Sequence, residues 1–428
     1  MSTVYIILPL ALMLGGLALA AFIAALRSGQ FDDLQTPAMR ILLDEATHQR
    51  PARLSTVASR ETTEPPGQGG SPTPRDFLAP PHEHGPERPV DLVTGATGLV
   101  GGNLVRELVG RGERVRVLAR LTSRQGHLAE LAGIEWVQGD ITDAASLSAA
   151  CAGIRRVYHC AALVSMWPGD AGAMMAVNAG GTENMLAAAR AGGVERFVHC
   201  SSVDAIGLPE PGGPPATEST PWNWEHMGVA TGYARSKLAA QDRVLAAVAQ
   251  GLDAVIVNPA LMFGPYDQKP SSGRMILEVA RGWLVAFPGG GNNVVDVRDV
   301  AAAMVAAAER GRCGELYILG NANMTYREIF SVMADVTGVA PPWLPVPRLV
   351  GIAAGMAAEA FGWLTGKPVE LNRESARMGF VEHYYDASKA RRELGLAASP
   401  VRGAVESAVA WLRSQRMLPP ASAPFIGR

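Results

Sequence analysis

The sequence predicts an α/β protein in which a doubly wound parallel sheet carries a smaller C-terminal cap, preceded by one transmembrane helix and a disordered linker. Three observations predict it. An uncharged apolar run opens the chain, a Pro- and Gly-rich stretch follows, and strand–helix units then repeat from Val90 to about Leu319. Such repeats require right-handed crossovers, which give a parallel sheet with helices on both faces. Ligands bind these sheets at the carboxyl ends of the strands.

Composition excludes several classes of protein. The 428 residues suit one large domain with additional segments, and the formal net charge of −2 gives no electrostatic basis for binding nucleic acid. The four cysteines show neither a CxxC motif nor a His–Cys spacing, so no metal site is expected. Unpaired thiols are typical of a reducing compartment.

The first expected element is a membrane helix at residues 4–26, because this run is uncharged and long enough to cross a bilayer. Arg27 is the first charge, and further arginines follow it. The positive-inside rule therefore places the N-terminus outside and the rest of the chain inside. We expect a single-pass protein of the inner (cytoplasmic) membrane with a cytoplasmic catalytic domain; a cleaved signal peptide is the alternative.

Residues 51–89 are rich in Pro, Gly, Ser and Thr and contain almost no large apolar side chains. Such a segment cannot bury a core, so it is expected to be a disordered tether. Its random-coil span is on the order of 35 Å.

A glycine-rich turn follows the apolar run at Val90–Val93. Gly95 permits a sharp turn, Gly98 lets backbone amides approach a pyrophosphate, and Gly101 lets the next helix pack closely on the strand. This is a dinucleotide-binding turn of the Rossmann type, with the phosphates at the N-terminus of the helix. The expected cofactor contacts here are Gly95, Thr97, Gly98, Leu99 and Val100.

Later strands are expected at 114–118, 134–137, 157–160, 196–200 and 254–257, with helices at 171–191 and 233–248. The chain then divides into residues 1–50 (membrane helix and juxtamembrane segment), the linker 51–89 and a catalytic domain 90–428. Within that domain the Rossmann core is expected at about 90–265 and 293–320, and the substrate-binding parts at about 266–292 and 321–413.

The candidate catalytic residues are Ser202, Tyr233 and Lys237. Tyr233 and Lys237 are four residues apart, so they share one face of a helix. An ammonium beside the phenol, together with a cationic oxidised nicotinamide, would favour the phenolate and bring Tyr233 into working range as acid or base. Lys237 would also hold the nicotinamide ribose, and Ser202 would hydrogen-bond the substrate oxygen.

The adenosine end of the site favours NADP over NAD. No acidic residue closes the second strand, where an NAD site usually has one. Arg120, with Ser123 or Arg124, is placed to meet a 2′-phosphate. Asp140 and Ile141 are expected to bracket the adenine.

The order and spacing of several motifs resemble the extended short-chain dehydrogenase/reductases, within the NAD-dependent epimerase/dehydratase superfamily. The resemblance covers about residues 89–413 and is closest to the dihydroflavonol-reductase-like and hopanoid-associated HpnA-like branch. Its motifs are Thr94–Gly101, Gly139–Ile141, His159–Ala162, Val177–Asn184, Ser201–Ser202, Tyr233–Lys237 and Asn258–Pro265. Besides the residues above, the resemblance implies cofactor contacts from Ala161, Ala162, Asn178, Ser201 and Pro259.

A second resemblance covers about the first 45 residues. The segment Ser28–Leu34, followed by Thr36-Pro37 and Arg40-Ile41-Leu42, resembles CcoS, a family of single-span maturation proteins of cbb3-type cytochrome oxidases. It implies cytochrome oxidase subunits or assembly factors as partners.

The substrate is expected to be a small apolar molecule of lipid, isoprenoid or steroid-like character. Six apolar side chains are expected either to line the substrate pocket or to belong to the core: Trp167, Ile206, Trp222, Trp224, Met262 and Phe263. Residues 347–365 form either a buried cap helix or a helix at a lipid surface. Two alternative functions remain, a nucleotide-sugar epimerase or dehydratase and an oxidase assembly factor with a fused reductase module; a homodimer is compatible with either.

Overall fold

The protein is described from a computed structural model, which describes residues 89–123, 126–282 and 284–418. Pro86–Arg428 forms one compact unit. The predicted membrane helix and all but the last residue of the predicted linker lie outside the described residues. Among the helices that are described, none combines the length and the apolar character needed to cross a bilayer.

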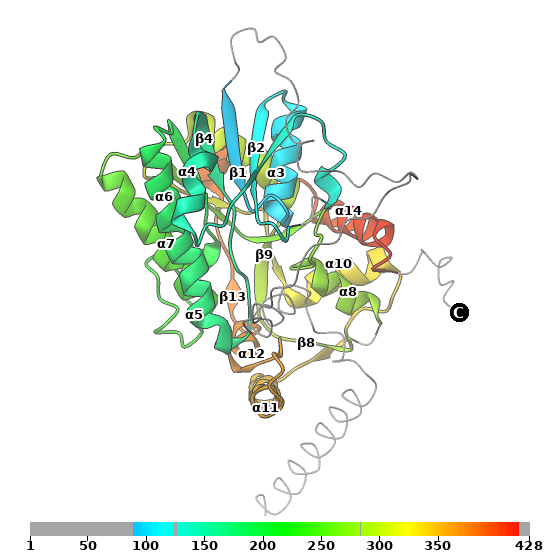
Figure 1. Cartoon of the computed structure of the whole chain (residues 1–428). Helices are drawn as coiled ribbons and strands as arrows, with labels where there is room; N and C mark the ends of the chain where they lie inside the picture. Colours follow the sequence, from blue (N-terminus) through cyan, green and yellow to red (C-terminus); the bar gives the residue numbers. More distant parts are fainter. Residues whose placement is uncertain (1–88, 124–125, 283, 419–428) are drawn as a thin grey trace, which may run out of the picture. The chain divides into compact units, whose positions relative to one another are not determined.

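The main sheet has seven parallel strands in the order β10-β6-β5-β4-β1-β2-β3 (Figure 1). The direction of winding reverses between β1 and β4, which is where a Rossmann-type sheet binds its ligand. The predicted fold class of the catalytic domain is confirmed. The strands are β1 (Val90–Thr94), β2 (Arg114–Ala119), β3 (Ile134–Gln138), β4 (Ile154–His159), β5 (Arg196–Cys200), β6 (Ala254–Pro259) and β10 (Leu316–Leu319).

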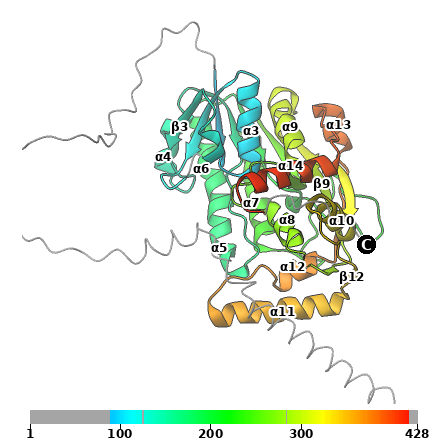
Figure 2. The same ribbon diagram turned by 90° about the vertical axis from the view of Figure 1, so that its right-hand side faces the viewer.

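Helices cover both faces of this sheet (Figures 1 and 2). On one face α3 (Leu99–Gly110) packs against α9 (Val297–Arg310). On the other, α6 (Gly181–Ala191) lies between α4 (Ala144–Cys151) and α7 (Gly232–Ala249). Leu104, Val105 and Leu108 of α3 are fully buried, and burial of each such side chain contributes about 1.5–3 kcal/mol.

The helix predicted at 171–191 is continuous but changes its winding. It consists of α5 (Ala171–Met174), a π-helical segment η3 (Met175–Gly180) and α6. Asn178 lies in the π-helical segment, and such segments occur frequently at functional sites. Short 3₁₀ turns lie at η1 (Gly126–Leu128), η2 (Pro168–Asp170) and η4 (Val203–Ala205).

A smaller sheet has the order β11-β9-β13, and β7 also pairs with β9. Its core lies against α8, α10 and α14, with Ile276, Met333 and Val405 buried between them. The strand β9 begins at Gly291 and belongs to this smaller sheet. The next two elements, α9 and β10, belong to the main sheet again. The bounds are β7 (Leu261–Phe263), β9 (Gly291–Asp296), β11 (Ala322–Thr325), β13 (Glu382–His383), α8 (Gly273–Ala280), α10 (Tyr326–Thr337) and α14 (Val401–Ser414).

The remaining elements pack on different parts of the unit. β8 (Ala286–Phe287) pairs with β12 (Leu344–Pro345), and α13 (Ser388–Leu394) packs against α9. Helix α11 (Arg348–Thr365) lies on α12 (Arg373–Met378) at the edge of the unit (Figure 2). The helix is confirmed, but the buried-helix alternative is wrong: Leu349 and Leu364 are 83% and 87% exposed.

Candidate active site

Most of the predicted site residues lie in segments that follow the parallel strands, at the carboxyl edge of the main sheet, whereas η3 supplies Asn178 and α7 supplies Tyr233 and Lys237. The glycine turn after β1 is closely packed. Gly95 has φ +69°, and a Cβ there would lie 2.6 Å from the backbone nitrogen of Ala161. A Cβ on Gly101 would lie 2.4 Å from the carbonyl oxygen of Gly95. Only glycine fits at these two positions.

Helix α3 starts from this turn with Gly98 as its N-cap. No side chain caps the helix, and its first turn contains no acidic residue. The first backbone N–H groups therefore have no side-chain acceptor, and the partial positive charge of the helix is not neutralised locally. A pyrophosphate is the kind of group that such an end accommodates.

Helix α7 carries the tyrosine and the lysine. Its N-cap Thr231 accepts a hydrogen bond from the backbone nitrogen of Ala234 at 3.0 Å, which fixes the first turn where Tyr233 lies. Lys237 is buried, and its Nζ donates to the carbonyl oxygen of Cys200, the last residue of β5, at 2.8 Å. Ser202 follows two residues later. The structure thus brings the three predicted catalytic residues to one place.

Burial shifts the pKa values of these groups. It lowers the pKa of the Lys237 ammonium. Burial, and then the charges of Asp204 and Cys200, raise the pKa of Tyr233, while a hydrogen bond with Ser202 opposes the rise. The expectation that Lys237 would lower the pKa of Tyr233 is therefore not met within the protein alone. The phenol stays protonated at neutral pH, as a proton donor must.

A buried amide network holds the serine segment. Asn258 Nδ2 donates to the carbonyl oxygen of Ser202 and to Gln241 Oε1, both at 2.8 Å. Ser201 Oγ donates to the same Gln241 oxygen at 3.0 Å. Ser201 thus lies at the predicted edge, but its hydroxyl is engaged inside the protein. Pro259 closes β6 beside this network.

A second network places the loop after β4. His159 contacts Thr94 Oγ1 at 2.8 Å and Thr182 Oγ1 at 3.1 Å, and burial lowers its pKa to about 3, so it is neutral. Asn178 accepts from the backbone nitrogen of Leu163 at 2.7 Å and donates to Ser236 Oγ at 2.9 Å. Asn178 therefore joins the loop of Ala161 and Ala162 to α7, next to Lys237.

The adenosine side is more open. Arg120 is exposed directly after β2, and its carbonyl oxygen accepts from the backbone nitrogen of Ser123 at 2.9 Å. Arg124 lies outside the described residues. Asp140 follows β3, but its carboxylate accepts from the backbone nitrogen and the hydroxyl of Thr142, both at 2.8 Å. Ile141 is buried in the core against Gly181.

The sequence did not predict one residue of the site. Asp204 follows Ser202 by two residues, and its backbone nitrogen donates to Ser202 Oγ at 3.1 Å. Burial raises the pKa of its carboxyl to about 6, against the opposing charge of Lys237. A lone acid in a short 3₁₀ turn has no spacing signal in the sequence; its place just beyond a strand end was the only indication.

The expected pocket walls separate into two groups. Trp167, Trp222 and Met262 are partly buried, whereas Ile206, Trp224 and Phe263 are fully buried in the cores. The Trp224 Nε1 donates to the carbonyl oxygen of Ile206 at 2.8 Å, so its polar atom is satisfied internally. Ile206, Trp224 and Phe263 are therefore structural residues.

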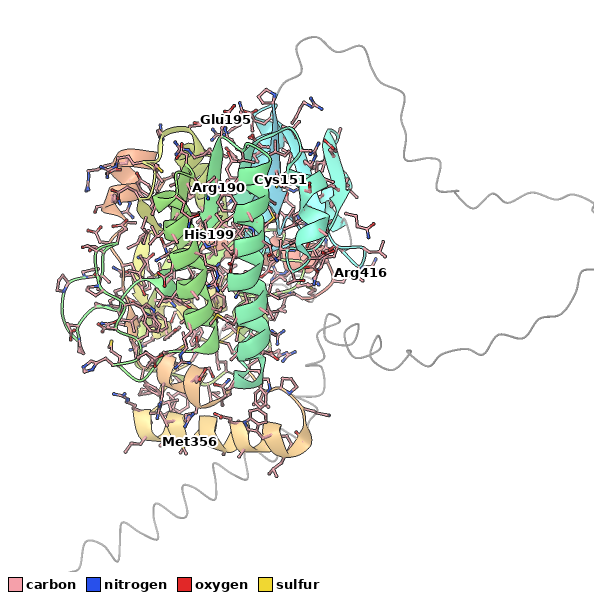
Figure 3. All side chains as sticks on the ribbon, turned by 60° about the vertical axis from the view of Figure 1, so that its left-hand side comes forward. Cys151, Arg190, Glu195, His199, Met356 and Arg416 are labelled. Carbon is pink, nitrogen blue, oxygen red and sulfur yellow. The ribbon has the colours of Figure 1, made fainter. Side chains whose placement is uncertain are left out.

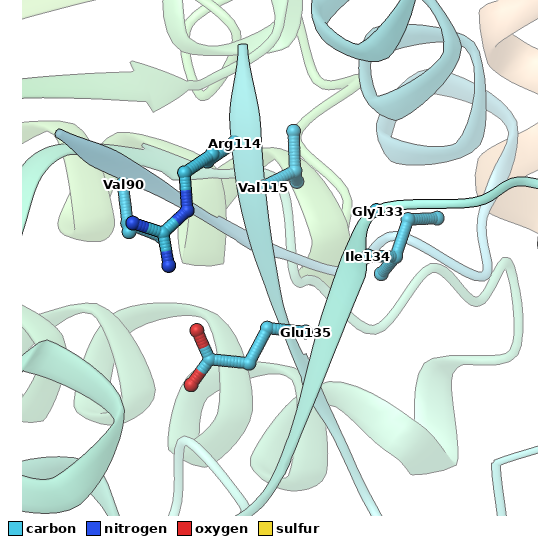
Figure 4. Close-up of a pocket in the computed structure, with 6 residues that line it drawn as sticks. All are labelled: Val90, Arg114, Val115, Gly133, Ile134 and Glu135. Atoms are coloured by element: carbon cyan, nitrogen blue, oxygen red, sulfur yellow. The ribbon is translucent and has the colours of Figure 1, made fainter. Parts of the chain in front are cut away.

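A pocket of about 270 Å³ lies elsewhere, at the amino ends of β1, β2 and β3 (Figure 4). It is lined by Val90, Arg114, Val115, Gly133, Ile134 and Glu135. Because this is the sheet edge opposite the catalytic residues, the pocket is not part of the site. In the described part of the chain, no three His, Cys, Asp or Glu side chains are grouped to hold a metal ion.

Residues 92–320 match the NAD-dependent epimerase/dehydratase family, and residues 2–45 match the cbb3-type cytochrome oxidase maturation proteins. A dihydroflavonol 4-reductase-like protein of Synechocystis sp. is 39% identical over 76% of this chain and 94% of its own. Sterol demethylase protein B of Methylococcus capsulatus is 38% identical, over 76% and 99%. The crystal structure of gox2253 has 38% identity and a TM-score of 0.69 over 77% of this chain and 99% of its own.

Replacing Asp204 by Asn tests the environment of the site. The folded pKa of about 6 exceeds the ordinary value of 3.8, so between these values the unfolded chain loses its proton first and the free energy of unfolding falls as pH rises. From pH 4 to 7, the wild type should lose about 2–3 kcal/mol relative to Asp204→Asn, measured by urea unfolding without cofactor. If the free energy of unfolding depended equally on pH in both proteins, the pKa of the Asp204 carboxyl would not be raised by folding.

Proposed function

The chain belongs to the NAD-dependent epimerase/dehydratase family as an oxidoreductase of the extended short-chain dehydrogenase/reductase type, and from this premise we propose that it is a membrane-tethered, NADP-dependent reductase of an apolar carbonyl compound. The observation that carries the proposal is the meeting of Ser202, Tyr233 and Lys237 beside the glycine turn. The bound nicotinamide would supply or accept the hydride.

The chain's own residues would handle the oxygen and its proton. Ser202 Oγ donates a hydrogen bond to the substrate oxygen as negative charge develops there. Tyr233 Oη delivers the proton, and its raised pKa keeps it protonated until the substrate oxygen becomes the stronger base. Lys237 holds the nicotinamide ribose hydroxyls and keeps a positive charge near the phenol. In the reverse direction Tyr233 accepts the proton.

An apolar substrate is supported by one side chain near the triad and by the relatives. Trp222 is partly buried, and its Nε1 donates to the carbonyl oxygen of Asp204 at 2.9 Å, which places an aromatic ring rather than a cation beside the serine segment. Nucleotide sugars carry phosphates that would call for basic partners. The relative named for sterol demethylation supports a sterol-like or isoprenoid ketone.

Replacing Tyr233 by Phe tests the mechanism. The variant keeps the ring but lacks the proton donor, so turnover should fall by about 10²–10⁴ while NADP still binds. The measurement is steady-state reduction of an apolar ketone together with a cofactor titration. Retention of more than about a tenth of wild-type turnover would refute the role of Tyr233.

Replacing Arg120 by Ala tests the cofactor preference. A charge-assisted contact to the 2′-phosphate contributes on the order of 1.5–3 kcal/mol, so NADP binding should weaken roughly 10- to 150-fold and NAD binding little. Arg111→Ala, at the exposed C-terminal end of α3, is the matched control and should affect neither cofactor. Equal weakening of both cofactors by Arg120→Ala would make Arg120 a general surface residue.

The membrane tether is the third part of the proposal. Residues 4–26 would cross the inner membrane once, and residue 90 onward would lie in the cytoplasm, where NADP and four unpaired cysteines are stable. The match of residues 2–45 to the cbb3-type maturation proteins supports this span and supports cytochrome oxidase subunits or assembly factors as partners. A reporter active only in the periplasm should be silent when fused after Leu43, and a cytoplasmic reporter active. The opposite pattern would make the run a signal peptide.

A further inference from the structure

The outward face of α11 is apolar along its whole length. Five large side chains of this helix are more than half exposed, and alanines fill the exposed positions between them. Leu349, Ala353, Met356, Ala360 and Leu364 fall at helical spacing on one stripe. Met356, labelled on this helix in Figure 3, is 53% exposed. The five side chains are Leu349, Val350, Met356, Trp363 and Leu364.

Charge is absent from this stripe. The helix has two charged residues, Arg348 at its first position and Glu359. Glu359 is only partly exposed and accepts a hydrogen bond from the backbone nitrogen of Arg373 at 3.0 Å. An exposed helix of a soluble domain ordinarily turns polar residues outward, so a continuous apolar face marks a contact surface.

The apolar face cannot turn inward, because glycines fix the other side of the helix against its neighbours. A Cβ on Gly355 would lie 2.5 Å from the carbonyl oxygen of Asn372, and one on Gly362 would lie 3.0 Å from the ring of Trp167. Backbone and rings meet here at close range. The orientation of α11 is therefore set by packing, and the stripe remains on the outside.

We propose that this face of α11 rests on the surface of a lipid bilayer. Arg348 at the start of the helix and Lys367 just beyond its end are exposed cations that can meet lipid phosphates. Trp343 and Trp363 are 71% and 58% exposed, and tryptophan favours the boundary between headgroups and acyl chains. The helix would lie in the plane of the interface, with its leucines among the acyl chains.

The area favours lipid over a second copy of the chain. A helix of 18 residues is about 27 Å long, and with a stripe about 10 Å wide it offers on the order of 300 Å². A stable protein interface buries about 800 Å² on each partner. A bilayer needs no such area when another element already holds the domain nearby.

That element is the membrane span of the proposed function, on which this inference rests. The linker that follows the span reaches on the order of 35 Å, so the domain stays close to the surface. Under this confinement a weak second contact is populated, because its effective concentration is high. One apolar helix then suffices to orient the domain.

The surface also connects to the active site. Trp363 packs against Trp167 with ring centroids 4.7 Å apart, and Asn372 donates to the carbonyl oxygen of Met166. The segment of Trp167 continues from Leu163, which Asn178 holds beside α7. An apolar substrate dissolved in the bilayer would thus meet the protein on the side where the segment 163–167 leads to the active site.

The test uses residues 86–428 and vesicles of phosphatidylcholine and phosphatidylglycerol at three to one, at a lipid concentration in the millimolar range, which replaces the effective concentration that the tether provides. This part folds on its own, because relatives match it over 94–99% of their own lengths while covering about three quarters of this chain. Flotation should show binding, and Leu349→Glu and Leu364→Glu should each lower the partition coefficient by about tenfold or more. Leu121→Glu, at an equally exposed leucine after β2, should not.

Failure of the wild-type unit to float, or an equal loss in Leu121→Glu, would overturn the bilayer contact. So would a dimer in solution that Leu349→Glu converts to a monomer, since a second copy would then cover the face. Turnover of a water-soluble ketone is measured in parallel and should not change in the α11 variants. Vesicle binding without any turnover would refute the reductase and retain the surface; turnover without binding would do the reverse.

Discussion

The hydrogen bond from the buried Lys237 ammonium to the carbonyl oxygen of Cys200 is the interaction on which the site depends. Burial of an ammonium without a partner would cost several kcal/mol, so the lysine needs an acceptor at this depth. The carbonyl that it finds is the last of β5, two residues before Ser202. The bond therefore joins α7 to β5 and holds Tyr233 and Ser202 in a common frame.

Burial, with the charges around this bond, sets the protonation state of the site. Burial raises the pKa of Asp204 and lowers that of Lys237, and the charge of each group opposes the shift of the other. Burial, and then the charge of the Asp204 carboxylate, raise the pKa of the Tyr233 phenol. A protonated phenol suits a group that gives its proton only when an alkoxide forms.

Local patterns predicted the sheet well. Strand positions came from short apolar runs, and the observed strands differ at their ends by at most three residues. Long-range partners were not predictable: Gln241 meets Ser201 and Asn258 only after folding, and no spacing in the chain marks it. Burial of Trp224 and exposure of α11 depend likewise on which neighbours the tertiary fold supplies. The sequence pattern of an apolar helix does not distinguish a helix that faces a core from one that faces a lipid surface.

The most direct test of the central claim follows the hydride. The full chain would be incubated with an apolar ketone and NADPH deuterated at the transferring position of the nicotinamide, and the released alcohol analysed by mass spectrometry and NMR. The account predicts one deuterium per molecule, on the carbinol carbon, with stoichiometric release of NADP. Recovery of the ketone unreduced and without deuterium, together with an epimerised or dehydrated product from a nucleotide sugar supplied in a parallel incubation and with the cofactor unchanged at the end of turnover, would contradict it and identify an epimerase or dehydratase.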